Sequence, residues 1–222
     1  TTNPRTRATP TPTKTMVASA EVAYLAKRSG DYGVGVGEVA VDLDKVRARK
    51  NAIVKSFREG SRKRIIDSGV ELIFGQASFT GAKTLQVIMQ DGSRRDLRAE
   101  RIVIDAGGRP RVPDINGLPD VPYLDSTSIM DLETVPEHLI ILGGGYIAIE
   151  FGQMFRRFGA RVTIIQHPEQ LLSREDDDVA QAVQGILEED GIEVFLNTDT
   201  TVVEKDQQGR MILKAESPDG EI

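Results

Sequence analysis

Residues 137–150 read EHLIILGGGYIAIE, an apolar run followed by three glycines and then by residues at helical spacing. This order of strand, turn and helix predicts a nucleotide-binding βαβ unit. Gly143 allows the tight turn, Gly145 lets the backbone approach a pyrophosphate, and Ala148 stands where a small residue lets helix and strand pack closely. Amides at the start of the helix would face the ligand's negative charge. The alternative is a βαβ unit that packs without binding anything.

The residues after this helix continue the same pattern. Residues 161–166 predict a second parallel strand, and residues 191–195 predict a third, with an acidic amphipathic helix at 176–190 between them. Two further apolar runs, at 200–204 and 211–215, predict a hairpin. Strands that alternate with helices in this way indicate an α/β fold built on a parallel sheet.

The first half of the chain predicts helices followed by short strands. Residues 1–12 lack hydrophobic periodicity and predict a disordered segment, whereas residues 13–30 and 42–68 predict amphipathic helices. The later elements are strands at 70–74, 76–79, 84–89 and 94–97, a mostly buried strand at 101–105, a proline-rich connector at 109–122 and a short helix capped by residues 125–127. The four short strands suggest an antiparallel β-meander beside the parallel sheet.

Composition excludes several classes of function. The 222 residues carry 28 Lys and Arg against 34 Asp and Glu, and this net charge of −6 argues against general nucleic-acid affinity. No apolar segment approaches the ~20 residues that span a bilayer. We expect no signal peptide, since an apolar stretch behind the first basic residues is missing. Cysteine is absent and the two histidines are isolated, which excludes disulfides, thiolate metal sites and a histidine cluster. We expect a cytoplasmic protein without membrane contact.

The second helix carries an excess of positive charge. Nine basic residues lie between Lys45 and Arg64, with Glu59 as the one acid among them. Such a helix could contact nucleic acid or an acidic partner. Aromatic residues do not interleave with these charges, so a solvated helix face is the preferred interpretation.

Four separated stretches carry a resemblance to a known family. They are residues 11–14 opening a helix, residues 102–117 with their glycines and prolines, residues 143–152, and residues 173–176. Together they resemble the flavin-dependent pyridine nucleotide–disulfide oxidoreductases, which are class I flavoproteins. Mercuric-reductase-like and dihydrolipoamide-dehydrogenase-like members give the nearest pattern. The resemblance runs through nearly the whole chain from about Thr11.

The resemblance implies Rossmann-like domains for FAD and for NAD(P). Residues 13–131 would form a partial FAD-binding domain, and residues 132–222 a truncated, inserted NAD(P)-binding domain, so the fold is expected to be incomplete at both ends. Members of the family pass a hydride from NAD(P)H to the flavin, and electrons then reach a disulfide or a metal-ion acceptor. The full-length protein would be a homodimer.

The family's redox-active cysteine pair is missing from this chain. The pair is expected just before Thr11, where Arg5 and Pro10 stand instead. Thiolate chemistry needs sulfur, so we expect an internal fragment that does not reduce disulfides by itself. One alternative is a redox-inactive remnant that only binds a nucleotide. Another is an interaction module that uses the basic helix.

The resemblance also implies roles for single residues near the flavin. Lys14 would lie close to the flavin N5 edge, with Glu150 pairing with it, although an exposed lysine and an ordinary first-turn carboxylate are the alternatives. Tyr146 would cover the nicotinamide pocket, and Ile147 follows it among the cofactor-binding residues. The turn formed by Ala106 and Gly107 resembles a flavin-contacting segment.

The choice between NAD and NADP depends on the end of the second parallel strand. Gln166 stands where an acid normally binds the ribose of NAD, and its amide can bond a hydroxyl without repelling a 2′-phosphate. Arg174 could supply a cation to that phosphate, as the resemblance suggests. His167 could approach the adenosine ribose. We therefore expect FAD and NADP as cofactors, with NAD as the alternative.

Overall fold

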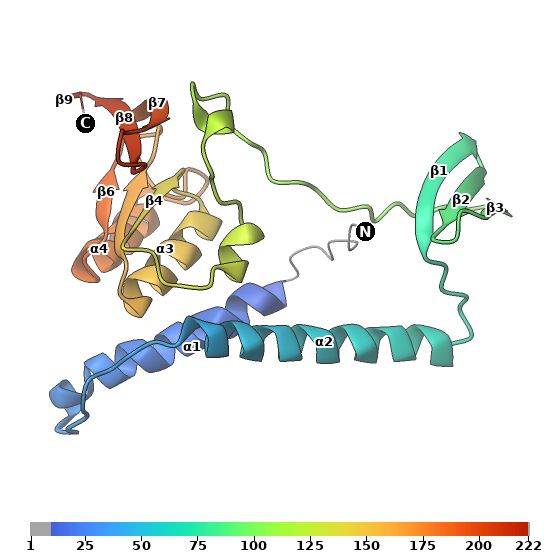
Figure 1. Ribbon diagram of the computed structural model, residues 1–222, viewed down its shortest axis with the longest axis horizontal. Helices are drawn as coiled ribbons and strands as arrows, with labels where there is room; N and C mark the ends of the chain where they lie inside the picture. Colours follow the sequence, from blue (N-terminus) through green and yellow to red (C-terminus); the bar gives the residue numbers. More distant parts are fainter. Residues whose placement is uncertain (1–9, 222) are drawn as a thin grey trace. The chain divides into compact units, whose positions relative to one another are not determined.

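The computed structural model describes residues 10–221 and contains two compact units. One consists of Thr1–Val54 and Pro110–Ile222, and the other of Lys55–Arg109 (Figure 1). These units are defined by which residues contact one another, and they differ from the predicted cofactor domains. The division into flavin and nucleotide domains near residue 132 stays a prediction. Residues 1–9 of the expected disordered segment lie outside the described residues, whereas residues 10–12 are helical.

The first unit contains the predicted parallel sheet. Its strands β4 (His138–Leu142), β5 (Arg161–Ile165) and β6 (Glu193–Phe195) lie in the order β4-β5-β6. Helix α3 (Tyr146–Phe158) connects β4 to β5, and α4 (Asp177–Glu189) connects β5 to β6 (Figure 1). The strand, turn and helix read from residues 137–150 are therefore confirmed.

The core of this unit forms where α3 packs on β5. Phe151, Phe155 and Phe158 recur at helical spacing and are buried, against Val162 and Ile164 on the strand. Burial of each large apolar side chain contributes about 1.5–3 kcal/mol, so this stripe holds the helix in place. The helix ends at Gly159, whose φ of 117° is left-handed.

Helix α1 (Pro10–Lys27) packs against α3. Its buried face contributes Met16 and Ala20 to the same core. At its carboxyl end the guanidinium of Arg157 lies 4.1 Å from the ring centre of Tyr24, and Lys27 Nζ donates to the carbonyl of Arg157 at 2.8 Å. The short 3₁₀ helix η1 (Ser29–Tyr32) follows α1, and residues 34–42 are irregular.

A connector and a hairpin complete the first unit. The connector contains the 3₁₀ helices η2 (Leu118–Asp120) and η3 (Ser128–Asp131), and the terminal sheet consists of β7 (Asp199–Lys205), β8 (Met211–Ser217) and β9 (Gly220–Glu221). Asp125 Oδ1 accepts hydrogen bonds from the amides of Thr127 and Ser128, at 2.8 and 2.7 Å, just before η3. Thr127 is the N-cap of η3 and makes no side-chain cap bond, and the predicted short helix is a single 3₁₀ turn.

Helix α2 (Leu43–Asp67) carries the predicted basic stretch. In the first unit its buried Lys50 donates to the carbonyl of Met130 at 2.8 Å and to Asp131 at 2.7 Å. In the second unit Lys63 pairs with Asp67 at 2.6 Å across one helical turn. Neither α2 nor any other described helix is both long and apolar enough to cross a bilayer.

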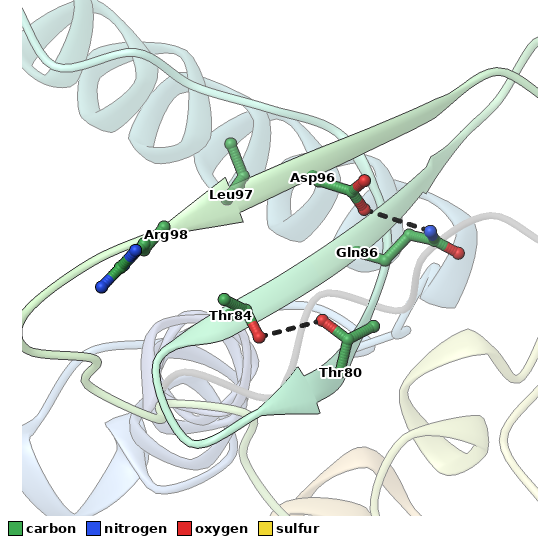
Figure 2. Close-up of a pocket in the computed structure, with 6 residues that line it drawn as sticks. All are labelled: Thr80, Thr84, Gln86, Asp96, Leu97 and Arg98. Atoms are coloured by element: carbon green, nitrogen blue, oxygen red, sulfur yellow. Dashed lines mark hydrogen bonds between the residues drawn. The ribbon is translucent and has the colours of Figure 1, made fainter.

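The second unit contains the predicted antiparallel meander. Strands β1 (Gly75–Gly81), β2 (Thr84–Met89) and β3 (Arg94–Arg98) pair in chain order. Figure 2 shows one face of this sheet, where Thr80 bonds to Thr84 and Gln86 bonds to Asp96, each at 3.1 Å. These polar side chains line a hollow of about 390 Å³ and are bonded to one another.

Two predicted strands of the second unit are wrong. Residues 70–74 form no strand, and Val70 and Phe74 are more than half exposed. Residues 101–105 form no strand either, and Val103 is 92% exposed. A strand needs a neighbour for its backbone hydrogen bonds, and the sheet described in this unit consists of β1, β2 and β3 alone. The apolar residues in these two segments therefore did not suffice to form a strand without a neighbouring strand to pair with.

Candidate nucleotide site

The three glycines after β4 have different geometries. Gly143 has a φ of 98°, and its amide donates to the carbonyl of Ile165 at 2.8 Å, extending the pairing of β4 with β5. Gly144 is buried. Gly145 begins α3 in the extended region, with φ −77° and ψ 174°, and a Cβ added there would meet nothing within 4 Å. The turn is therefore tight at its first glycine and open at its last.

Backbone amides at the start of α3 are available to a ligand. The first bond into the helix runs from the amide of Ile149 to the carbonyl of Gly145, at 3.1 Å. The amides of Tyr146, Ile147 and Ala148 therefore precede the intrahelical ladder. They carry the partial positive charge of a helix start, which suits a phosphate group.

Close packing between helix and sheet occurs one turn later than the sequence suggested. Ala148 is only half-buried, whereas Gly152 is buried. A Cβ added at Gly152 would lie 3.4 Å from the side chains of Ile141 and Ile164. Gly152 is thus a site residue that the sequence interpretation did not single out, although its spacing of a helical turn from Ala148 was visible.

A groove of about 840 Å³ opens beside the glycine turn. The turn and α3 line it with Gly143, Gly145, Ile147 and Ala148, and most of its remaining wall is apolar. Tyr146 and Ile147 are exposed at the start of α3. Concave apolar walls beside a few convergent polar groups are the usual form of a cofactor site.

Gln166 lies at the end of β5 and faces the turn. Its side chain is buried, with only 6% exposed. Oε1 accepts a hydrogen bond from the amide of Gly144 at 2.6 Å, and Nε2 donates to the carbonyl of Gln170 at 2.9 Å and to Ser173 Oγ at 3.2 Å. Gln166 thus lies directly after β5, with its side-chain amide bonded to other groups of the protein, and its contact with a nucleotide stays a prediction.

The other two residues expected near the adenosine ribose are exposed. His167 follows Gln166 and pairs through Nδ1 with Asp199 at the start of β7. Arg174 lies on the loop between β5 and α4. Their contacts with a nucleotide stay predictions.

Lys14 and Glu150 form an ion pair between α1 and α3. The Lys14 side chain is 62% exposed and the Glu150 side chain is 26% exposed. The pairing that the resemblance implied is present, and it leaves the ammonium group open to solvent. Its role beside a flavin stays a prediction.

Ala106 and Gly107 belong to the second unit. Both are exposed in an irregular segment, and Gly107 has a φ of 71°, a left-handed conformation that favours glycine. Contact with a flavin stays a prediction for this pair. Among residues 10–221, no group of three or more His, Cys, Asp or Glu side chains is placed to hold a metal ion.

The sequence pattern of the pyridine nucleotide-disulphide oxidoreductases matches residues 3–221, nearly the whole chain. The chain belongs to this family. The family uses FAD and NAD(P). The family resemblance is confirmed that was inferred from residues 11–14, 102–117, 143–152 and 173–176.

Characterised relatives in the family are longer than this chain. Mercuric reductase of Streptomyces lividans is 34% identical over 212 residues, which are 95% of this chain and 44% of that protein. Dihydrolipoyl dehydrogenase of Bacillus subtilis is 32% identical over 195 residues, which are 84% of this chain and 41% of that protein. The chain therefore spans less than half the length of these relatives.

A solved structure shows the same architecture. The HOCl-induced flavoprotein disulfide reductase RclA from Escherichia coli superposes with a TM-score of 0.76 at 30% identity, over 95% of this chain and 43% of RclA. A Cu(II) complex of RclA gives a TM-score of 0.77. The parallel and antiparallel sheets described above thus match part of the flavoprotein disulfide reductase fold, which confirms the predicted α/β class.

Proposed function

We propose that the turn at Gly143–Gly145 binds the pyrophosphate of a nicotinamide dinucleotide. The observation that carries this proposal is the set of backbone amides at 146–148, which precede the helical ladder and lie beside the open position at Gly145. In the complete protein this site would serve an FAD-dependent oxidoreductase that passes hydride from NAD(P)H through FAD to a disulfide or metal-ion acceptor.

Lys14 and Glu150 would act at the flavin edge of that enzyme. FAD, when bound, supplies the hydride-accepting chemistry. The exposed ammonium of Lys14 would stabilise negative charge that develops there, and Glu150 would orient it through their ion pair. Ala106 and Gly107 would let backbone approach the flavin.

NADP is the proposed nucleotide, with NAD as the alternative. The neutral amide of Gln166 places no negative charge at the end of β5, so a 2′-phosphate would meet no repulsion there. Arg174 is exposed on the following loop and would supply a cation. We expect Arg174→Gln to weaken NADPH binding more than NADH binding.

A second candidate is a redox-inactive nucleotide-binding protein. It rests on the absence of cysteine from all 222 residues, since thiolate exchange with a disulfide is then impossible for this chain. Visible absorbance of the purified protein separates the candidates. Flavin bands that bleach with NADPH support the oxidoreductase, whereas nucleotide binding without flavin supports the second candidate.

Calorimetry with NADPH and NADH tests the site itself. Gly145→Leu keeps an ordinary backbone conformation but places a side chain where the phosphate would lie, so we expect at least tenfold weaker binding. The control is Gly185→Leu on α4, where an added Cβ also meets nothing within 4 Å. Absence of heat with both nucleotides in the unaltered chain would refute the proposal.

A further inference from the structure

The buried amide of Gln166 has its hydrogen-bonding groups in use. Its oxygen accepts from the Gly144 amide at 2.6 Å, and its nitrogen donates to the Gln170 carbonyl at 2.9 Å and to Ser173 Oγ at 3.2 Å. The two backbone partners fix the orientation of the side-chain amide, because the Gly144 N–H needs an acceptor and the Gln170 carbonyl needs a donor. Rotation of the amide would oppose like groups at both ends.

These bonds join the glycine turn to the loop after β5. The Gly144 amide is buried, and Gln166 supplies its acceptor. The carbonyl of Gly144 accepts from the amide of Leu172 at 2.9 Å, so both backbone polar groups of this glycine are bonded to the 166–172 segment. A buried amide without an acceptor is strongly disfavoured, so the conformation of the turn depends on Gln166.

We infer that Gln166 is a positioning residue that holds the glycine turn in its binding conformation, and that it does not read the ribose 2′ position. This inference rests on the proposed nucleotide site. A residue that reads the 2′ position would discriminate NADH from NADPH. A residue that positions the turn would affect both nucleotides equally, because both carry the same pyrophosphate.

Hydrogen exchange tests the positioning role without any nucleotide. In the unaltered chain the Gly144 amide should exchange at least tenfold more slowly than the amide of the exposed Gly145. Gln166→Met has similar length but no acceptor and should abolish this protection. Gln166→Glu, measured at an acid pH where its carboxyl is protonated, keeps an acceptor for Gly144 and a donor for Gln170 and should retain the protection. Equal exchange of Gly144 and Gly145 in the unaltered chain would overturn the inference even if neither variant folds.

Nucleotide titrations test the consequence for selectivity. Gln166→Met should weaken NADH and NADPH binding by the same factor, about tenfold for one lost bond to the turn. The control is Gln184→Met on α4, whose side chain donates to Glu188 at 2.7 Å, and its affinities should match the unaltered chain. A change in the NADH-to-NADPH ratio at position 166 would overturn the inference.

The two measurements also separate this inference from the proposed function. If the unaltered chain binds neither nucleotide, the proposed site is refuted, and the claim about selectivity falls with it. If it binds them and Gly144 lacks protection, the site stands and Gln166 is not its positioning residue.

Discussion

Gly143, Gly144 and Gly145 are adjacent but are required for different physical reasons. Gly143 needs a left-handed backbone, with φ 98°. Gly144 needs space, because an added Cβ would lie 2.4 Å from Leu171 Cδ2 and 3.0 Å from Gln166 Cδ. Gly145 needs neither, and its lack of a side chain matters only to a ligand that approaches the backbone.

This division predicts unequal effects of alanine at neighbouring positions. Gly144→Ala should lower the free energy of unfolding by about 1–3 kcal/mol, since Leu171 is fully buried and cannot retreat without disturbing the core. Gly145→Ala is the control and should leave stability almost unchanged. Urea denaturation followed by circular dichroism measures both, and equal losses would contradict the assignment.

At the level of elements, the parallel strands are linked by side chains as well as by their backbones. His138 Nε2 lies 2.9 Å from Thr163 Oγ1, and this hydroxyl donates to Glu193 at 2.7 Å, so one chain of contacts crosses β4, β5 and β6. Desolvation lowers the pKa of His138 below its ordinary value of 6.5, and Arg161 lowers it further, against the opposing charges of Glu193 and Glu137.

The lowered pKa predicts how stability depends on pH. Folding disfavours protonated His138, so the neutral side chain contributes to the free energy of unfolding. This contribution is complete above about pH 6.5 and is lost as the pH falls from there through the lower pKa of the folded state. The decline should be smaller in His138→Gln. Urea denaturation at several pH values, with His167→Gln as the control, measures the difference. Identical pH profiles for His138→Gln and the unaltered chain would exclude this contribution.

The connector depends on one glycine where it meets β7. Gly117 has a φ of 79°, and an added Cβ would lie 2.0 Å from the carbonyl oxygen of Val203. The amide of Val203 bonds to the carbonyl of Asn116 at 2.9 Å, so the two segments cannot separate without losing this bond. Both the conformation and the space therefore require glycine.

We predict that Gly117→Ala lowers the free energy of unfolding by more than about 2 kcal/mol, because backbone strain and overlap add. The control is Gly209→Ala in the turn between β7 and β8. Gly209 has a similar φ of 80° but open space around it, so it should lose only about 1 kcal/mol. Thermal unfolding of both variants compares them. Equal losses would show that overlap with Val203 does not matter.

At the scale of the whole molecule, the two units differ in charge. Lys55–Arg109 contains eleven Lys and Arg against seven Asp and Glu, although the complete chain has a net charge of −6. The units also differ in how well their apolar side chains are covered. The first contains the buried stripe of α3, whereas Phe79, Val103 and Ile104 of the second are more than half exposed.

Limited proteolysis should identify a described segment whose backbone is readily accessible to a protease. Residues 101–112 are irregular and almost entirely exposed, so we predict that trypsin first cleaves after Arg101 or Arg111. The combined variant Arg101→Gln, Arg111→Gln should slow this cleavage several-fold. Arg94→Gln in β3 is the control and should not. Mass spectrometry identifies the fragments, and a first cut within α2 would contradict the prediction.

The sequence determined the elements whose signals are local. Glycine spacing, apolar periodicity and the turn before α3 predicted β4, α3 and β5, because each signal depends on residues a few positions apart. The family was recognised from short stretches as well, at residues 11–14, 102–117, 143–152 and 173–176. The strands expected at 70–74 and 101–105 failed because strand formation needs a neighbouring strand, which no local pattern supplies.

Only the tertiary structure decided what the site residues contact. The sequence proposed Gln166 for ribose binding, which stays a prediction, but it gave no sign that folding brings the Gln166 Oε1 atom 2.6 Å from the Gly144 amide, 22 positions earlier in the chain. Folding likewise placed the close helix–sheet approach at Gly152, one helical turn after Ala148. Such contacts depend on how separate elements pack, and packing is a property of the folded chain.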